Sequence, residues 1–471
     1  IISYNMKFFL RELYKTPSKM KPFVALSLLL ILFFWKVFFV GYDVTGMVSL
    51  YNDSIYRASK PDHLSYPYLS DASSVLQAFP WSMYMAESLR RGIIPLWNPY
   101  SGAGTPLLAN WQSTPFFPLK IIFYLFPGLW TFNIYLILCL LLAGTAAYAY
   151  AREINIGRYG AFFSAVTYMV CGYSLSRISY VDNATACCFP LLLLCTEKFL
   201  SHRKFFPLLS MIVACVIFSG HPESTALIIF ASVVYVVVRA WASLRRALPL
   251  FFSSNIIGFL LAGVTLFPFV EYLLNAEARR ITIEIHGSLL DQWKSMVSLF
   301  LPSLFSGEEG TIYIGITGLG LGLYGVMSLR RHWPLLFVLL AGLFFVFIHP
   351  LSYIDPLYTV PLCVLPLSLI GGMSVESFKR EKRRSTFFVL GGSLLSIVAL
   401  LSGCGMILYG KTIGEIMGYA GVQAFLAVLF GCAGFLNRRT LPRFLLGLQI
   451  CDLFINSLWI CLLYTSDAAD E

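Results

Sequence analysis

Charged side chains are scarce in this sequence. Asp, Glu, Lys and Arg together make up 12% of its 471 residues, whereas hydrophobic residues make up 58%. An ordinary soluble domain carries about 25% charged residues. So low a charge content excludes a soluble fold and indicates a protein that is mostly embedded in lipid.

Patterns that bind metal ions are also missing. The eleven cysteines include no C-x-x-C pair and no Cys/His spacing typical of zinc, and the chain contains no D-x-D pair. Ten cysteines lie within apolar segments and one, Cys461, lies in the tail. We therefore expect the ten to be small packing residues. The chain also shows no convincing internal repeat of the kind found in many transporters.

The apolar residues gather in long runs, each approaching the roughly 20 residues that cross a bilayer core. Thirteen runs predict transmembrane helices near residues 22–41, 129–151, 160–177, 183–200, 205–220, 224–241, 249–272, 312–329, 334–349, 356–374, 386–408, 417–435 and 443–460. We therefore expect an all-α, polytopic membrane protein in which residues 1–460 form a single transmembrane domain.

Basic residues cluster at the same end of alternate helices. One cluster precedes the first run, and each later cluster follows an even-numbered run, at residues 152–158, 198–204, 239–246, 330–331, 379–384 and 438–443. Cytoplasmic loops carry the excess of Lys and Arg in membrane proteins. We therefore expect a cytoplasmic N-terminus, and the net charge of +10 indicates membrane anchoring rather than nucleic-acid binding.

This topology leaves two long loops outside, at residues 42–128 and 273–311. Within the first, Asp71–Arg91 predicts an amphipathic helix whose apolar side could lie on the bilayer, with a kink at Pro80. Residues 461–471 back-translate well to a sequencing adapter, so we expect them to be an artefact that cuts the thirteenth helix short.

The first loop carries a dense pattern of aromatic, proline and polar residues. The pattern comprises Asp71, Gln77, Phe79-Pro80-Trp81, Glu87-Ser-Leu-Arg-Arg-Gly92, Pro95-Leu-Trp-Asn-Pro99, Gly104-x-Pro106, Leu108-Ala-Asn110, Gln112 and Phe117-Pro118, and Ser219-Gly-His-Pro-Glu223 follows later. It resembles the YfhO-type bacterial membrane proteins, which are grouped with the GT-C glycosyltransferases.

That resemblance implies a GT-C-like fold in the bacterial cytoplasmic membrane. It also implies transfer of a sugar from a polyprenyl-phosphate donor to a cell-envelope polymer at the outer face. The partners would be the lipid-linked sugar, the acceptor polymer and the bilayer. Because the D-x-D pair is absent, a divalent metal stays open and no other cofactor is expected.

Such a transfer needs a carboxylate to accept the proton of the attacking hydroxyl. Asp71 is the leading candidate for this base, and Glu87 is the second catalytic candidate. The alternative for Asp71 is a helix N-cap or a solvated loop acid. Arg90 or Arg91 could bind the departing phosphate, although either could instead adhere to anionic lipid headgroups.

Eight further residues are candidates for substrate binding, and each has an ordinary structural alternative. Trp97 and Asn98 could hold a sugar or form a packed turn. The others are Asn110, Gln112, Arg177, Asp182, His221 and Glu223. Arg177 and Asp182 could simply pair with each other, and His221 and Glu223 could be only a loop.

Two other classes of function fit the same hydropathy. One is a flippase or transporter of lipid-linked sugars or polymers, and the other is a non-catalytic envelope assembly factor. The polar residues concentrate in outer loops, which argues against transport. A fold alone cannot exclude a scaffold, because function depends on the site.

Overall fold

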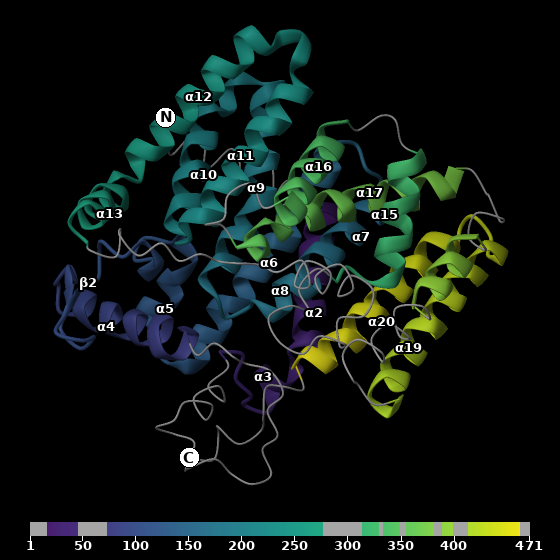
Figure 1. The fold of residues 1–471 in the computed structure, drawn as a ribbon, viewed down its shortest axis with the longest axis horizontal. Coiled ribbons are helices and arrows are strands. Elements are labelled where there is room, and N and C mark those ends of the chain that lie inside the picture. Colours follow the sequence, from purple (N-terminus) through teal and green to yellow (C-terminus); the bar gives the residue numbers. More distant parts are fainter. Residues whose placement is uncertain are drawn as a thin grey trace.

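The computed structural model describes residues 17–45, 73–276, 313–328, 333–348, 355–380, 389–398 and 413–461. Within these ranges the protein is a bundle of helices with one short hairpin of strands (Figure 1). The predicted all-α class is thereby confirmed. Of the second predicted loop, residues 277–311 lie outside the described residues. Asp71 and residues 462–471 lie outside them as well.

The chain begins with two helices and a structured first loop. These are α2 (Pro17–Phe33), α3 (Trp35–Phe39), the π-helical turn η3 (Ser74–Ala78), α4 (Phe79–Arg90), β1 (Trp97–Asn98), β2 (Thr105–Pro106), the 3₁₀ turns η4 (Trp111–Ser113) and η5 (Pro118–Lys120), and α5 (Ile121–Leu125). The two strands form an antiparallel hairpin that pairs Trp97 with Pro106 and Asn98 with Thr105.

The remaining elements form the body of the bundle. They are α6 (Leu129–Glu153), α7 (Arg158–Met169), α8 (Gly172–Ser176), α9 (Val181–Ser201), η6 (Arg203–Phe205), α10 (Phe206–Phe218), α11 (Pro222–Arg239), η7 (Trp241–Ser243), α12 (Leu244–Leu261), α13 (Gly263–Asn275), α15 (Ile316–Ser328), α16 (Trp333–Ile348), η10 (Pro356–Thr359), α17 (Val360–Arg380), a helix at Val389–Val398, α19 (Ile413–Cys432), η11 (Ala433–Phe435) and α20 (Leu441–Cys461).

Helices lie within each of the thirteen apolar runs, but three runs are divided. The first breaks at Phe34, the third between α7 and α8, and the seventh at Ala262. Five of the described helical segments are long and apolar enough to cross a membrane: Leu129–Glu153, Val181–Ser201, Pro222–Arg239, Trp241–Leu261 and Leu357–Phe378.

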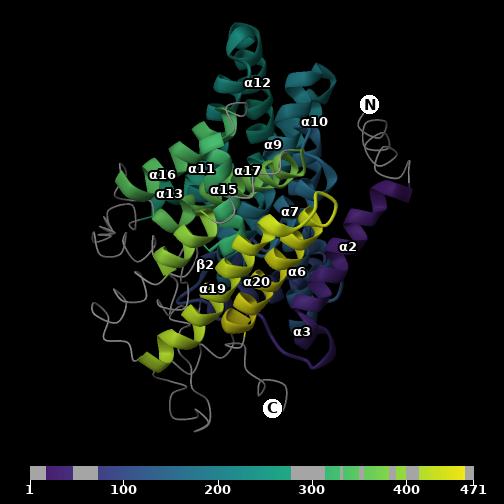
Figure 2. The same ribbon diagram turned by 90° about the vertical axis from the view of Figure 1, so that its right-hand side faces the viewer.

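The centre of the bundle is α17, and its edge is α12. The most apolar window of α17 is 94% buried, whereas that of α12 is only 28% buried, so α12 presents its side chains to lipid. Figure 2 shows α2 along one side and α19 and α20 along the face turned to the viewer. Small residues allow the close packing at the centre, because a side chain on Gly160 would collide with the carbonyl of Gly372.

The predicted amphipathic helix of the first loop is present as η3 and α4, with the π-helical turn directly before Pro80. Its apolar side does not form one bilayer-facing surface. Val75 and Ala86 are buried, and the ring of Phe79 packs edge-to-face on Phe132. Most of this side therefore packs against protein.

Candidate functional site

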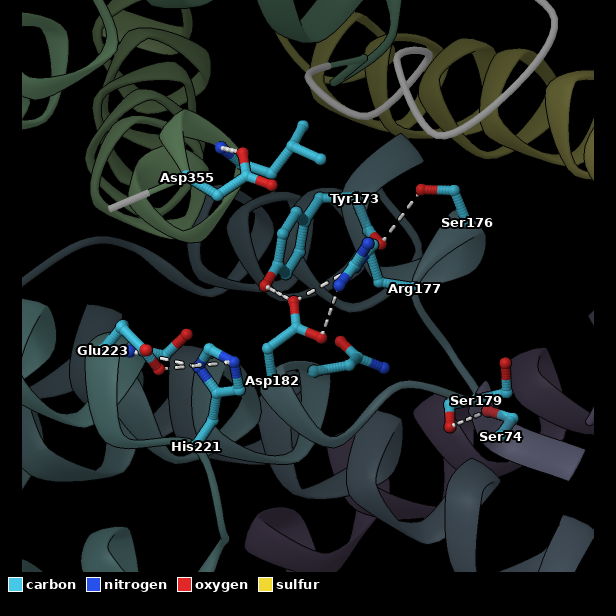
Figure 3. A network of polar contacts seen from close by, with 12 residues as sticks. Ser74, Tyr173, Ser176, Arg177, Ser179, Asp182, His221, Glu223 and Asp355 are labelled. Carbon is cyan, nitrogen blue, oxygen red and sulfur yellow. Dashed lines mark hydrogen bonds and ion pairs between the residues drawn. The ribbon is translucent and has the colours of Figure 1, made fainter. Parts of the chain in front are cut away.

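Polar residues from several parts of the chain lie close together (Figure 3). Helix α9 begins at Val181 and ends near the basic residues at 198–204, and α11 begins at Pro222 and ends at Arg239. The beginnings of both helices therefore lie at the end opposite these basic residues. Four of the predicted site residues lie here: Arg177 and His221 just before the two helices, and Asp182 and Glu223 in their first turns.

Arg177 and Asp182 form a buried ion pair at the start of α9. Arg177 donates through Nη2 to Asp182 Oδ1 over 3.0 Å and through Nε to Oδ2 over 3.1 Å. The hydroxyl of Tyr173 donates to the same Oδ2 over 2.7 Å. A carboxylate in the first turn of a helix is also stabilised by the helix dipole. The alternative that these two residues pair with each other is thus what the structure shows.

His221 caps the N-terminus of α11. Its Nδ1 accepts the N–H of Ser224 over 3.2 Å, so the neutral ring carries its proton on Nε2. That Nε2 lies 3.7 Å from Oε2 of Glu223. Burial lowers the pKa of His221, although Asp182, Glu223 and Asp355 oppose the shift. The imidazole is therefore neutral at neutral pH and offers one N–H donor.

Two tyrosines lie against these polar groups. The ring of Tyr180 lies 3.9 Å from the Arg177 guanidinium carbon, and the ring of Tyr358 lies 4.3 Å from the His221 ring. Tyr358 belongs to η10, whose N-terminus is capped by Asp355 through Oδ1. The cluster of Tyr173, Arg177, Tyr180, Asp182, His221, Glu223, Asp355 and Tyr358 is hereafter the outer cluster.

Helix α8, which carries Tyr173, is held from the other side of the bundle. The N–H of Gly172 donates to the carbonyl of Tyr313 over 2.7 Å. The hydroxyl of Tyr313 donates to Asp452 Oδ1, and Gln423 Oε1 lies 2.9 Å from that hydroxyl. Residues of α19 and α20 therefore reach the outer cluster through Tyr313.

The first loop is attached at two points to segments that lead into the outer cluster. Near its start, the hydroxyl of Ser74 donates to the carbonyl of Ser179. Near its end, Nε1 of Trp111 donates to the carbonyl of Ile217 over 2.6 Å. Gly220 has a φ of +103°, and a side chain there would collide with the methyl group of Thr114. Only glycine permits this contact between the loop and the turn before His221.

Lys120 is a buried base that the sequence interpretation missed. Its Nζ donates to the carbonyl of Ser113 over 3.1 Å and to the hydroxyl of Thr114. Burial lowers its pKa to about 7. Since Thr114 has a φ of +54°, Lys120 ties down a turn in the left-handed conformation beside Gly220.

The charged candidates of the first loop lie elsewhere. Glu87 is exposed and pairs with Arg91, and Arg90 donates to the carbonyl of Leu125 over 2.8 Å. These residues lie at the C-terminal end of α4, whereas Ser74 lies at the other end of the η3–α4 segment. At about 1.5 Å per residue, the segment separates its two ends by about 20 Å. The structure therefore does not bring Glu87, Arg90 and Arg91 into the outer cluster.

Three of the four polar or aromatic candidates of the first loop, Trp97, Asn98 and Asn110, have side chains with local contacts. Asn98 is buried, accepts the N–H of Tyr100 and donates to Ser101. Asn110 accepts the N–H of Gln112 and caps η4. Trp97 is 51% exposed and packs its indole against Gly104. Trp97 and Asn98 form strand β1, and the Asn98 side chain bonds to Tyr100 and Ser101 in the turn that follows.

Within the described ranges, no three His, Cys, Asp or Glu side chains converge in a way that could hold a metal ion. A divalent metal therefore stays a prediction.

Two crystal structures of ArnT from Cupriavidus metallidurans are similar to this fold. The apo structure aligns with a TM-score of 0.54 at 16% identity, over 94% of this chain and 76% of that one. The structure bound to undecaprenyl phosphate aligns with a TM-score of 0.53 at 15% identity, over 86% and 74%. No protein-family model and no curated protein matches the sequence.

The chain described here therefore has a polytopic helical membrane fold like that of ArnT, and the polytopic membrane class agrees with the prediction from the sequence. At this level of identity the likeness defines the fold alone.

Proposed function

We propose that this protein is a membrane glycosyltransferase that moves a sugar from a polyprenyl-phosphate donor to an acceptor at the extracytoplasmic face. The observation that carries the proposal is the outer cluster, which lies in a fold like that of ArnT at the end opposite the basic residues of α9 and α11. The comparison structure with undecaprenyl phosphate supports a lipid-linked donor.

The composition of the outer cluster suits a sugar better than a phosphate. Asp182, Glu223 and Asp355 outnumber the single cation Arg177, which already pairs with Asp182. Carboxylates accept hydrogen bonds from hydroxyl groups, and the N–H of His221 can donate one. Tyrosine rings offer flat apolar faces beside them. We therefore assign the sugar or the acceptor hydroxyl, rather than the lipid phosphate, to this cluster.

Asp71 remains the proposed general base. It precedes Ser74 by three positions in the sequence, and Ser74 is bonded to Ser179 beside the outer cluster. Three steps along the chain span at most about 11 Å, and this short connection to Ser74 supports the proposal. A base accepts the hydroxyl proton as the oxygen attacks the anomeric carbon, and the bond to the lipid phosphate breaks.

The narrower predictions belong to the same proposal. The acceptor would be a cell-envelope polymer, the host membrane would be a bacterial cytoplasmic membrane, and the first-loop motif would mark a YfhO-type protein. Each rests on the first-loop residues rather than on the fold.

Transport is the rival with a specific observation behind it, since Asp452 is a buried acid within α20. Its Oδ2 accepts the N–H of Ile316 over 2.6 Å and thereby caps α15, and Asn456 donates to its Oδ1. These bonds give Asp452 a structural role. Because they satisfy its carboxylate, no transported ion is needed to explain a buried acid at this position.

The proposal is tested with purified protein in nanodiscs supplied with polyprenyl-phosphate sugars, with mass spectrometry of envelope polymers identifying the product. Asp71→Asn keeps the shape of the side chain but cannot accept a proton, so turnover should fall on the order of 10²–10⁴-fold. Glu87→Gln is the matched control and should leave turnover nearly unchanged.

Near-normal transfer by the Asp71→Asn protein would remove Asp71 from the mechanism. Movement of an intact lipid-linked sugar without transfer would establish the transporter instead.

A further inference from the structure

The hairpin of the first loop exposes an unusual run of large apolar side chains. Ile93 is 58% exposed, Ile94 63%, Leu96 62%, Trp97 51% and Tyr100 81%. Contiguous exposed apolar residues of this kind mark an interaction surface rather than a surface in water. Figure 1 shows the hairpin at the edge of the molecule, beside α4 and below α13.

The hairpin is held in a fixed position on α4. The rings of Tyr84 and Tyr100 pack edge-to-face with centroids 5.5 Å apart. The N–H of Leu107 donates to the carbonyl of Leu96 over 2.9 Å and closes the base of the hairpin. The apolar run therefore keeps its direction relative to α4.

The contact of Arg90 indicates how deep the hairpin and the end of α4 lie relative to the membrane. Its guanidinium bonds to the carbonyl of Leu125, the last residue of α5. The membrane-crossing helix α6 begins at Leu129, and Trp130 in its first turn is 59% exposed. Exposed aromatic residues at the ends of crossing helices lie at the membrane–water interface. The C-terminal end of α4 and the base of the hairpin are therefore level with lipid headgroups.

The charges beside the hairpin fit that depth. Arg90 and Arg91 are both exposed, and among the residues that the structure describes only Arg91 has an acidic partner, Glu87. The end of α4 thus keeps a net positive charge directly before Ile93. Arginines next to exposed apolar side chains are typical of segments that lie in the interface of an anionic membrane.

We propose that residues 93–100 insert into the outer leaflet of the bilayer, with Arg90 and Arg91 on the phosphates of anionic lipids. The occupant of this surface is bulk lipid, not the donor and not a protein. The inference does not depend on glycosyl transfer, because it uses only exposure, depth and charge.

The insertion is tested with an environment-sensitive fluorophore on Leu96→Cys, in full-length protein whose exposed native cysteines are replaced by serine. Nanodiscs contain lipids with a quencher on the acyl chain. A label on Leu260→Cys, on the lipid-facing side of α12, serves as the lipid reference. A label on Asn437→Cys, in the exposed turn before α20, serves as the water reference. The Leu96 label should be quenched comparably to the Leu260 label. Quenching no greater than at Asn437 would overturn the insertion.

The assignment of Arg90 and Arg91 to anionic lipid phosphates is tested by a separate measurement. Quenching of the Leu96 label by brominated phosphatidylglycerol is compared with quenching by brominated phosphatidylcholine. Arg90→Gln with Arg91→Gln should reduce the preference for the anionic lipid by up to about fivefold for each arginine. Binding of undecaprenyl phosphate is measured on the same double variant. An unchanged lipid preference with lost undecaprenyl phosphate binding would overturn the assignment and return the arginines to a donor site.

Discussion

The carboxylate of Asp182 shows what single residues contribute to the site. It accepts two bonds from Arg177 and one from Tyr173, and both charged side chains are buried. Separating such a pair leaves a buried charge without compensation, which costs more than the pair itself contributes. The ion pair therefore holds the turn before α9 in place and keeps both of its side chains charged.

Asp182→Asn should destabilise the protein on the order of 3–5 kcal/mol, because Arg177 keeps its buried charge. The double change Asp182→Leu with Arg177→Met removes both charges and should be less destabilised than the single change. Thermal unfolding in detergent, at fixed lipid content, measures both. A single variant as stable as the wild type would show that the pair is not buried as described.

His221 should make stability fall on acidification. Because its folded pKa is lowered, the unfolded chain binds more protons below about pH 6.5, and stability decreases from there down to the folded pKa. Protonation also places a hydrogen on Nδ1, which can then no longer accept the N–H of Ser224. His221→Asn keeps a good capping residue without a titrating group, so its melting temperature should depend less on pH between about 6.5 and 5. An identical pH profile for the two proteins would contradict this assignment.

At the scale of elements, the apolar runs predicted where helices lie but not where they break. The breaks after α7 and α12 lie next to Gly172 and Gly263, yet many other glycines in the chain sit inside helices. Hydropathy reports the length of chain within lipid and carries no information on backbone direction. The sequence predicted a turn at Pro95–Pro99, because proline and asparagine favour turns directly, but Trp97–Asn98 is a strand and the turn begins only at Pro99.

Helix α8 depends on an element that is far away in sequence. Tyr313→Phe removes the hydroxyl bonded to Asp452 but keeps the carbonyl that accepts from Gly172. The buried polar partners then lose a bond, which costs about 1–3 kcal/mol. We expect faster hydrogen exchange in residues 172–182, since α8 is held through Tyr313.

Tyr168→Phe is the matched control, because the Tyr168 hydroxyl donates to the carbonyl of Ala186 and not to the Tyr313 network. Its exchange in residues 172–176 should stay close to that of the wild type. Equal protection of residues 172–182 in the wild type and in Tyr313→Phe would rule out the coupling.

At the scale of the whole molecule, the outer cluster could be predicted only in part. The motif at 219–223 and the tight turn at 177–182 indicated Arg177, Asp182, His221 and Glu223. Nothing indicated Tyr173, Tyr180 or Tyr358, since a tyrosine in an apolar segment looks like an ordinary packing residue. Asp355 and Tyr358 reach His221 only through the packing of α11 against α16 and η10, which one sequence does not reveal.

The orientation in the membrane remains a prediction with a direct test. Glu87→Cys is exposed on α4, and Asn437→Cys lies at the basic end of the bundle. A membrane-impermeant thiol reagent should label position 87 in intact cells and position 437 only after lysis. The opposite pattern would place the N-terminus outside and move the outer cluster to the cytoplasm.

The two attachments of the first loop impose an order of events during synthesis. Ser74 is bonded to a residue 105 positions later, and Trp111 to one 106 positions later. At about 5–20 residues per second, each partner leaves the ribosome about 5–20 seconds after the loop residue it binds. The loop is thus made long before the residues that it binds. The second attachment cannot form until α10 (Phe206–Phe218) has been made, and the outer cluster is not complete until Tyr358 has been made. A nascent chain that stalls before α10 therefore contains the first loop without its second attachment.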